Sequence, residues 1–406
     1  MFKDSTVENP ELENSAKCVQ ANNFHDLFAF IRQQYPQLVD VPLHVPLLGD
    51  CEKRFLSSCI DTTFVSSVGP AIQAFEQAIT GLTNCSHAIA TVNGTAALQL
   101  ALLVAGVKPG SEVITQGLTF IGTVNAIAHC GAGPIFVDVE TATLGMSPEA
   151  LRLWLQSNTQ QQDRQCVNRH TGKIVTACVC MHTFGHPARL DELQTVCDEF
   201  NVTLIEDAAE AFGSEYRGSP VGARGHCGIF SFNGNKIITT GGGGALVTND
   251  ELLATRARHI ATTAKLNHPW NSEHDQVGYN FRMPNLNASL GLAQLQHFQQ
   301  MLESKRQLAQ AYRDFFAESS LQWVEEPVEC RSNYWLNAVI CRDQTQRDEL
   351  LQAAADNRIQ MRPAWQPPPY SKVYGHCQRG ALDNTLLLAQ RLVNLPSSAK
   401  DLVHAQ

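Results

Sequence analysis

The sequence lacks the features that mark several large classes of protein. Its formal net charge is −9, so it lacks the basic excess that binding to the phosphate backbone of DNA or RNA requires. Its longest apolar runs, such as residues 98–107, are too short and too polar at their ends to span a bilayer. The polar, acidic N-terminal residues do not resemble a secretory signal peptide. We therefore expect a cytoplasmic protein that binds neither nucleic acid nor membrane.

Paired cysteines are also missing. The thirteen cysteines are scattered singly, and none forms a CxxC pair of the kind that indicates a zinc or redox site. Cys178 and Cys180 alternate along an apolar segment, as buried side chains of a strand do. We interpret the cysteines as small buried residues, and we expect no metal site.

What the sequence does contain is a regular alternation of apolar strands and helices. Strands are predicted at 113–115, 134–140, 174–182 and 202–207, and helices at 121–129 and 189–201. Short strands that alternate with helices favour a mostly parallel sheet with helices on both faces.

The alternation ends near residue 287, where a second region is predicted. One long helix is expected over 288–319, followed by strands near 334–341 and 358–363. Before the alternating region, a weakly ordered lead-in is expected over residues 1–25, with helices over 24–35, 51–60 and 71–80. The predicted organisation is an N-terminal lead-in and helix over 1–40, a large α/β domain over 41–287 and a small C-terminal α+β domain over 288–406.

Lys236 is the first candidate for chemistry. It follows a predicted strand in the segment GIFSFNGNKIITTGGGGALV, residues 228–247. A lone lysine is usually a solvated surface charge, but these neighbours are apolar or small and include no carboxylate. A lysine amine in such surroundings can attack an aldehyde and form a Schiff base. The four glycines at 241–244 allow backbone to approach closely at a site or a tight turn.

Asp207 is the second candidate, because it ends the apolar strand of VTLIEDAAEA. A carboxylate at the carboxyl end of a parallel strand lies where ligands bind in open α/β sheets. There it can pair with the pyridine nitrogen of pyridoxal phosphate (PLP) and keep that nitrogen protonated. Capping of the following helix explains an isolated aspartate equally well. The presence of Lys236 on a neighbouring strand end favours the cofactor role.

Three other positions complete a possible cofactor site. Gly94 and Thr95 at the start of a predicted helix offer backbone N–H groups and a hydroxyl to a phosphate, and Ser231 adds a second hydroxyl. Phe120 follows a strand and is able to stack on an aromatic ring. Each of these residues also fits a plain structural role as a cap or a core residue. Together with Lys236 and Asp207, they supply all the contacts that PLP needs.

The segments NGTAALQLAL, TFIGTVNA, IEDAAEAFGS, FSFNGNKIITTGGGG and GYNFRMPNLNA occur in this order between about residues 42 and 362. In combination they resemble the DegT/DnrJ/EryC1/StrS family of sugar aminotransferases. The resemblance implies PLP-transferase fold type I, which is aspartate-aminotransferase-like, with a mostly parallel central sheet and a smaller C-terminal α+β domain. It also implies a homodimer with shared active sites, with L-glutamate as the amino donor.

The same resemblance implies roles for individual residues. Lys236 would be the catalytic lysine that carries the cofactor and moves the proton, Asp207 would bind the pyridine nitrogen, and Phe120 would stack on the ring. Glu210 occupies a position near the cofactor that relatives often fill with Gln or His. The other implied cofactor contacts, mainly to the phosphate, are Gly94, Thr95, Ser231 and Asn233, with Asn280 reaching across from the partner subunit.

Within the family, VPLLGDCEKRFLSSCIDTTFVSSVGP, MHTFGHPARLDEL and SNYWLNAVI most resemble the LegC-type subgroup. This implies amination of the keto carbon, at C4, of a nucleotide-linked 4-keto-6-deoxy sugar such as UDP-2-acetamido-2,6-dideoxy-4-hexulose. The product would serve bacillosamine- or legionaminic-type amino-sugar biosynthesis for cell-surface polysaccharide. The segment PAWQPPPYSKVYGHC is shorter and richer in proline than in that subgroup.

Several other functions are alternatives to this interpretation. A nicotinamide-dependent oxidoreductase needs a G-x-G-x-x-G after the first strand, and the sequence has none in that context. Related sugar dehydratases resemble one another in replacing the lysine with histidine, whereas Lys236 is present. An aminotransferase for a 3-keto sugar or an eight-carbon keto-acid sugar stays open, as does a non-catalytic ligand-binding protein with the PLP fold.

Overall fold

The computed structural model describes residues 24–222 and 224–400. The predicted lead-in over residues 1–25 therefore lies almost entirely outside the described residues. Within them, no helix is both long enough and apolar enough to cross a membrane.

The central sheet has seven strands in the order β1-β11-β10-β7-β6-β2-β3. Neighbouring strands pair in parallel, except that β11 is antiparallel to both β1 and β10. The predicted mostly parallel sheet is confirmed. Its strands are β1 (His87–Thr91), β2 (Glu112–Gln116), β3 (Gly133–Val137), β6 (Val175–Met181), β7 (Thr203–Asp207), β10 (Cys227–Ser231) and β11 (Gly244–Thr248).

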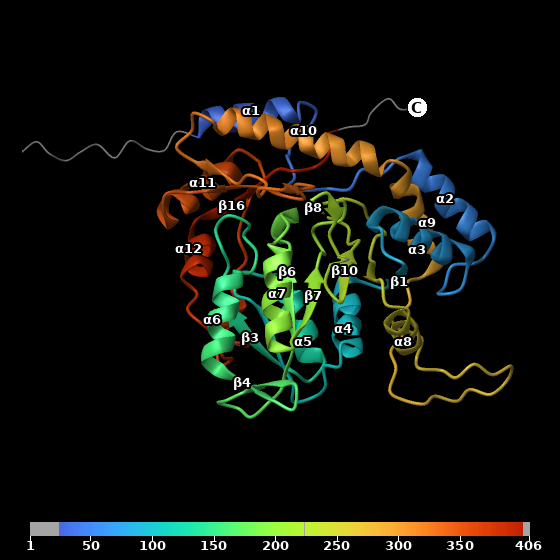
Figure 1. Ribbon diagram of the computed structural model, residues 1–406. Coiled ribbons are helices and arrows are strands. Elements are labelled where there is room, and N and C mark those ends of the chain that lie inside the picture. Colours follow the sequence, from blue (N-terminus) through green and yellow to red (C-terminus); the bar gives the residue numbers. More distant parts are fainter. Residues whose placement is uncertain (1–23, 223, 401–406) are drawn as a thin grey trace, which may run out of the picture.

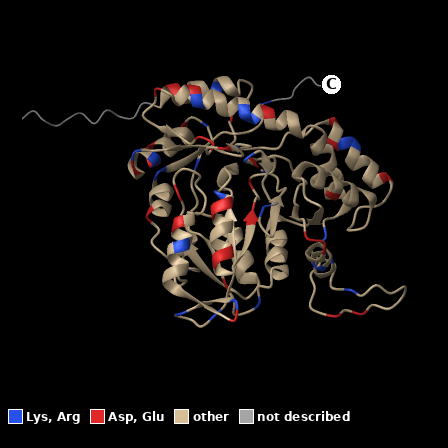
Figure 2. Ribbon diagram, viewed as in Figure 1, with Lys and Arg blue, Asp and Glu red and all other residues tan. Residues whose placement is uncertain are grey.

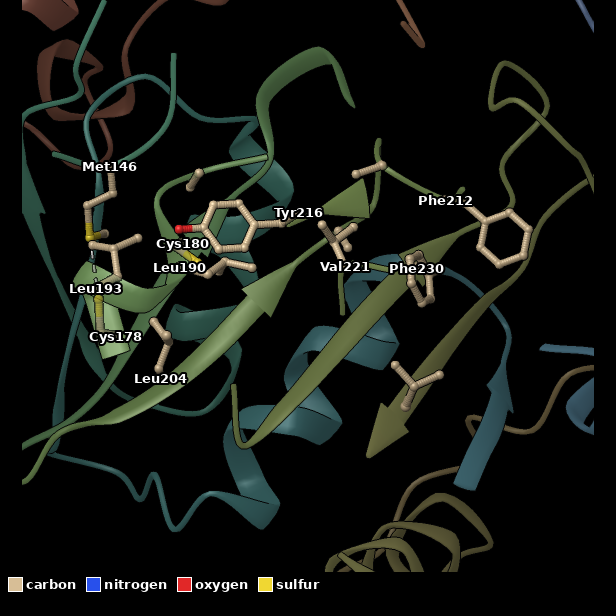
Figure 3. Packing of buried hydrophobic residues seen from close by; sticks show 14 of the residues in the cluster. Met146, Cys178, Cys180, Leu190, Leu193, Leu204, Phe212, Tyr216, Val221 and Phe230 are labelled. Carbon is tan, nitrogen blue, oxygen red and sulfur yellow. Dashed lines mark hydrogen bonds between the residues drawn. The ribbon is translucent and has the colours of Figure 1, made fainter. Parts of the chain in front are cut away.

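Helices cover both faces of this sheet (Figure 1). In β6, Cys178 and Cys180 belong to the hydrophobic cluster that includes α6 (Pro148–Asn158) and α7 (Leu190–Phe200). Ala177 and Val179 belong to the opposite cluster, which includes α4 (Gly94–Val104), α5 (Ile121–His129) and α8 (Glu251–Ala261). This follows from the period of two along a strand, and Figure 3 shows part of the first cluster.

The cysteines take part in these cores as small apolar side chains. Ten of the twelve described cysteines are buried, the other two are partly buried, and all twelve are free thiols. The interpretation of the cysteines as buried residues is therefore confirmed for ten of them. Figure 2 shows that charged residues are frequent on outer helices such as α2 (Asp50–Asp61) and α10 (Phe298–Phe316) and sparse on the central strands.

The prediction of one helix over 288–319 is wrong. The chain forms α9 (Asn285–Gln296) and α10, which are separated at His297. α9 packs against α2 and α3 (Pro70–Thr83), whereas α10 packs against the C-terminal region and α1 (His25–Gln34). Because the apolar spacing continues through His297, the sequence does not reveal that the two halves have different packing partners.

The C-terminal region contains a four-stranded antiparallel sheet in the order β12-β14-β16-β15. Its elements are β12 (Gln322–Trp323), β14 (Asn337–Ile340), α11 (Gln344–Asp356), β15 (Arg362–Pro363), α12 (Asp383–Arg391) and β16 (Leu392–Leu395). The strand predicted over 358–363 is thus only two residues long. Helix α1 lies along α10 (Figure 1), with the rings of Phe30 and Phe315 stacked at 4.5 Å between centroids.

Smaller strands complete the described chain. They are β4 (Thr159–Gln162), β5 (Gln165–Asn168), β8 (Glu215–Tyr216), β9 (Ser219–Pro220) and β13 (Cys330–Arg331), with 3₁₀ turns at Thr183–Gly185 and Pro368–Tyr370.

Residues 41–47 run between the large sheet and the C-terminal region. The Val41 amide donates to Arg358 O at 3.0 Å, and Leu43 O accepts from the Ser397 amide at 2.7 Å. Gln294 Nε2 of α9 donates to Leu47 O at 2.8 Å. These bonds fix the backbone on either side of His44 and direct this short segment past the carboxyl ends of the central strands.

Candidate active site

A cavity of about 520 Å³ lies at the carboxyl ends of the central strands. Two groups of residues line it. We call the first the sheet wall: Gly94, Thr95, Phe120, Asp207, Glu210, Ser231, Asn233 and Lys236. We call the second, which comes from the C-terminal region and the 41–47 segment, the cover wall: His44, Trp335, Gln360, Arg362, Trp365 and Asn394. Eight of the nine predicted site residues therefore meet in one cavity.

Lys236 lies in the turn that follows β10, where its amide donates to Asn233 O at 3.0 Å. Its side chain is 13% exposed, and Nζ is 3.4 Å from Glu210 Oε1. On another side, Nζ lies 3.8 Å from the centroid of the Trp335 ring. The amine is therefore held inside the cavity by one carboxylate and one aromatic face, and it is not the solvated charge of an ordinary surface lysine.

Asp207 ends β7, whose parallel neighbour β10 leads directly to Lys236. One carboxylate oxygen accepts from the Thr123 hydroxyl at 2.7 Å, and the other accepts from the Ala209 amide at 3.2 Å. Burial raises the pKa of Asp207, while the Thr123 hydroxyl and the nearby charge of Lys236 act in the opposite direction. These bonds orient the carboxylate and leave it lining the cavity, where a protonated ring nitrogen is a suitable partner.

Glu210 is buried beside these two residues. Its Oε2 accepts from the Phe184 amide at 2.9 Å, and Phe184 has a left-handed backbone (φ 57°), which is uncommon for a residue other than glycine. Burial raises the pKa of Glu210 to about 7, although the charge of Lys236 works against this rise. Near neutral pH, Glu210 is thus able to accept or release a proton at the atom that faces Nζ.

The N-terminus of α4 forms the far end of the sheet wall. Asn93 caps this helix by accepting from the Ala96 amide at 2.8 Å, so the amides of Gly94 and Thr95 remain free of intrahelical bonds. Among the described residues, the hydroxyls of Thr95 and Ser231 have no hydrogen-bond partner. Free first-turn amides and two hydroxyls at one place make a site for a phosphate group.

Glycine is required at this end for reasons of packing. A Cβ on Gly94 would lie 2.9 Å from Ser231 Cβ, and one on Gly244 would lie 2.6 Å from the carbonyl carbon of Asn93. The glycine run at 241–244 thus allows β11 to approach the start of α4 closely. The expected close approach of backbone is confirmed, at a place beside the phosphate site.

Phe120 lies at the edge of the cavity, 48% exposed, with its ring centroid 6.3 Å from that of Trp365. It is not part of the core. Asn233 also lines the cavity, and its Nδ2 donates to Asn235 Oδ1 at 3.2 Å. Asn280 is exposed and does not line the cavity of its own chain. It pairs with Thr262 at the base of the segment 262–281, which extends away from α8 (Figure 1).

The residues of the cover wall were not predicted from the sequence. Asn394 is 3% exposed, and its Nδ2 has no hydrogen-bond partner among the described residues. Burial and the charges of Lys305 and Lys236 hold the pKa of His44 well below its usual value, so its ring is neutral. A lone asparagine in the apolar strand LVNL was the available signal, because a buried amide needs a partner. The sequence around His44 carries no comparable signal.

These residues fit PLP. Lys236 and Asp207 follow neighbouring strands and line the same cavity, so it offers an amine for an aldehyde and a carboxylate for a ring nitrogen. The Gly94 backbone and the Ser231 hydroxyl form a cradle that a single added Cβ would fill. The site can therefore hold an aromatic aldehyde that carries a phosphate, with Phe120 at its rim.

Comparisons with known proteins agree with this assignment. The model of the DegT/DnrJ/EryC1/StrS aminotransferase family matches residues 48–402. A GDP-perosamine synthase of Escherichia coli O157:H7 is 37% identical over 363 residues, covering 88% of this chain and 93% of the relative. A protein of Bacillus subtilis (strain 168), to which pyridoxal phosphate-dependent aminotransferase activity is ascribed, is 32% identical, covering 88% and 90%. The crystal structure of the aminotransferase TlmJ from Streptoalloteichus hindustanus superposes with a TM-score of 0.80 at 27% identity, covering 88% and 93%.

Proposed function

The chain belongs to the DegT/DnrJ/EryC1/StrS aminotransferase family, and on that premise we propose that it aminates C4 of a nucleotide-linked 4-keto-6-deoxy sugar with L-glutamate as donor. It is a PLP-dependent sugar aminotransferase that acts on the keto group of a nucleotide sugar. The placement of Lys236, Asp207 and the α4 N-terminus around one cavity supports the PLP-dependent part of the proposal, and the LegC-like segments of the sequence support the position of the keto group.

Pyridoxal phosphate supplies an electrophilic aldehyde carbon and an electron-withdrawing pyridinium ring. In this chain, the amine of Lys236 would hold the aldehyde carbon, and Asp207 would hold the ring nitrogen in its protonated form. Gly94, Thr95 and Ser231 would bind the phosphate, and Phe120 would cover one face of the ring. Asn233 lies beside this position on the turn that carries Lys236.

Proton transfer is assigned to Lys236 Nζ, because this amine lies in the cavity at the carboxyl ends of the central strands and the family resemblance implies this role for it. Glu210 Oε1, 3.4 Å from Nζ, keeps the free amine oriented toward the sheet wall. Since the pKa of Glu210 is raised to about 7, its carboxyl group can also store a proton near neutral pH. Trp335 in the cover wall lies over Nζ and limits the access of water to it.

The nucleotide is the least determined part of the substrate. The names of similar proteins include GDP-perosamine synthase, which favours a GDP-linked sugar. The LegC-like segments of the sequence instead favour UDP-2-acetamido-2,6-dideoxy-4-hexulose, and so bacillosamine- or legionaminic-type biosynthesis. We propose a 4-keto-6-deoxy ring with either nucleotide, and the acceptor assay described below distinguishes the two.

A homodimer is part of the proposal. Asn280 lies outside the cavity of its own chain, on a segment with two highly exposed apolar side chains, Trp270 (81%) and Val277 (84%). In a second copy, this segment would cover the phosphate end and bring Asn280 to it. The twelve free thiols favour the reducing cytoplasm as the location.

The first test is the absorbance spectrum of the purified protein before and after addition of L-glutamate. The proposal predicts a visible band that glutamate bleaches and that a 4-keto sugar nucleotide restores. GDP-linked and UDP-linked 4-keto-6-deoxy sugars are compared as acceptors in the same assay. A protein that shows no visible band after supply of PLP would contradict the catalytic proposal and favour a ligand-binding protein of the same fold. A band that does not respond to glutamate would contradict only the donor.

The shared site has its own test. Lys236→Ala and Asn280→Ala variants, each impaired alone, are unfolded, mixed and refolded together. If Asn280 acts across the interface, mixed dimers contain one site with both native residues, and turnover exceeds that of either variant. No gain on mixing, with dimers present by light scattering, would contradict an intersubunit role of Asn280.

A further inference from the structure

The inference concerns Trp335, which lies in the cover wall directly against the amine of Lys236. Nζ is 3.8 Å from the indole centroid, well within the roughly 6 Å over which an ammonium group is attracted to an aromatic face. Tryptophan has the most favourable ring for this interaction. The side chain of Lys236 is only 13% exposed, so little water competes with the contact.

Trp335 is fixed by three hydrogen bonds, two of which reach other parts of the fold. Its indole Nε1 donates to Asn235 O at 2.7 Å, on the same turn as Lys236. Its backbone amide donates to Asn333 Oδ1 at 2.8 Å. Its backbone carbonyl accepts from Nζ of Lys305, a fully buried lysine of α10, at 3.1 Å. The ring plane therefore does not depend on Lys236 and is set before the amine contacts it.

Two different groups face Nζ of Lys236, a carboxylate and an indole ring. Glu210 Oε1 lies on one side at 3.4 Å, and the indole lies on another at 3.8 Å. His44, the histidine of the cover wall, is partly buried and its ring is neutral, so it adds no charge beside Nζ. Nζ thus has a carboxylate oxygen and an aromatic face as its two neighbours, and both are groups that attract a positive charge.

We propose that Trp335 is a positioning residue that holds the free, protonated amine of Lys236 beside Glu210 whenever the amine is not bonded to another group. The indole replaces the water that would otherwise solvate the ammonium and so favours the position of Nζ beside Glu210. The C-terminal region, through Trp335, thereby controls an amine that the central sheet carries. This inference rests on the role assigned to Lys236.

The test measures the free amine directly, on the full-length chain freed of bound cofactor. Trace acylation with acetic anhydride at fixed pH labels neutral amines, and peptide mass spectrometry gives the labelling of Lys236 relative to the exposed Lys53. In W335L the ratio should rise about 2- to 30-fold, which corresponds to loss of a cation–π contact of about 0.5–2 kcal/mol. W335F keeps an aromatic face and should recover most of the native ratio.

Trp365→Leu is the matched control, because it removes an indole of the same cavity that does not lie over Nζ. Its labelling ratio should equal that of the native chain. Equal ratios in W335L and the native chain would overturn the proposal, as would equal increases in W335L and W335F. Neither sugar nor cofactor is used, so this test fails or succeeds independently of the proposed transfer reaction.

A second measurement covers the case in which W335L does not fold. All five tryptophans are replaced biosynthetically by singly and multiply fluorinated tryptophan, which nearly preserves ring size and withdraws electron density from the face. Labelling of Lys236 relative to Lys53 should rise stepwise with fluorination. A ratio that stays flat across the series in folded protein would overturn the proposal.

Discussion

The two walls of the cavity are built in different ways. In the sheet wall, functional groups follow directly from strand ends and helix starts: Asp207 ends β7, Lys236 follows β10, and Gly94 begins α4. The cover wall is assembled from segments about 350 residues apart in the chain, from His44 to Asn394. The first wall offers groups that suit a cofactor. The second contains a buried amide that lacks a partner among the described residues.

The two walls also differ in the buried titratable group that lies in or next to each of them. Glu210 of the sheet wall is an acid whose pKa burial raises to about 7. Lys305, directly behind the cover wall, is a base whose pKa burial lowers to about 7. We infer that the sheet wall performs chemistry common to related enzymes, whereas the cover wall selects the substrate and positions the amine.

The largest expected effect comes from the sheet wall. Lys236→Ala should reduce turnover by at least about 10⁴-fold, since it removes both the amine proposed to hold the cofactor and the group proposed to move the proton. Turnover is measured with glutamate and a 4-keto sugar nucleotide. Lys53→Ala, an exposed lysine, serves as the control and should keep native turnover. A fully active Lys236→Ala variant would contradict the proposal that the sheet wall performs the chemistry.

The next effect tests whether Asp207 acts through its charge. Asp207→Asn keeps the shape and the bond with Thr123 but removes the negative charge, so kcat should fall on the order of 10²- to 10³-fold. Thr123→Val, which keeps the charge and removes one hydrogen bond, should cost about tenfold at most. If both variants lose activity equally, orientation and not charge is the contribution of Asp207.

The pH dependence of stability tests the lowered pKa of Lys305, the buried base behind the cover wall. The folded-state pKa of Lys305 (about 7) is below its unfolded value (10.5), so the unfolded chain binds more protons between these values. Stability from this group therefore increases as pH rises above about 7, by at most about 1.4 kcal/mol per pH unit. Lys305→Met should remove that slope.

Urea midpoints of the native chain and Lys305→Met between pH 7 and 9 give the measurement. The free energies of unfolding should diverge with rising pH, in favour of the native chain. Parallel curves would show that the buried amine does not titrate in this range.

The smallest effect is expected in the cover wall. Asn394→Ala should raise KM for the sugar nucleotide about tenfold, because we propose that Nδ2, which has no partner among the described residues, binds an acceptor group of the substrate. The glutamate half-reaction, followed by the loss of the visible band, should stay within about twofold of the native rate. A change in the glutamate half-reaction alone would assign Asn394 to the donor.

The difference between the walls also explains what could be predicted from the sequence. Asp207 and Lys236 follow apolar strands, and the carboxyl ends of parallel strands meet at one edge, so their proximity follows from local pattern and sheet topology. Trp335 lies in a segment that carried family resemblance, but nothing local places its ring over Nζ. That contact depends on how α10 and the C-terminal sheet pack onto the large sheet.

Two other limits have the same cause. The apolar spacing of residues 288–319 is continuous, yet the helix divides at His297 because its halves meet different partners. Asn280 was assigned a place in the site by family resemblance alone, and its own chain leaves it outside the cavity. Each of these features is decided by tertiary or quaternary packing, to which the periodicity of one segment is insensitive.

The glycine run beside the phosphate site has a consequence for how sequence variation should be interpreted. Gly244 touches no proposed ligand, yet any side chain there would collide with the backbone of Asn93, which caps the helix proposed to bind the phosphate. In a saturation-mutagenesis experiment, substitutions of Gly244 should therefore be tolerated as poorly as substitutions of Lys236, although Gly244 takes no part in the chemistry. Selection for cofactor binding therefore acts on residue 244 through the space available to its side chain. We expect amino-acid changes at residue 244 during evolution to be coupled to changes at residues 93 and 94.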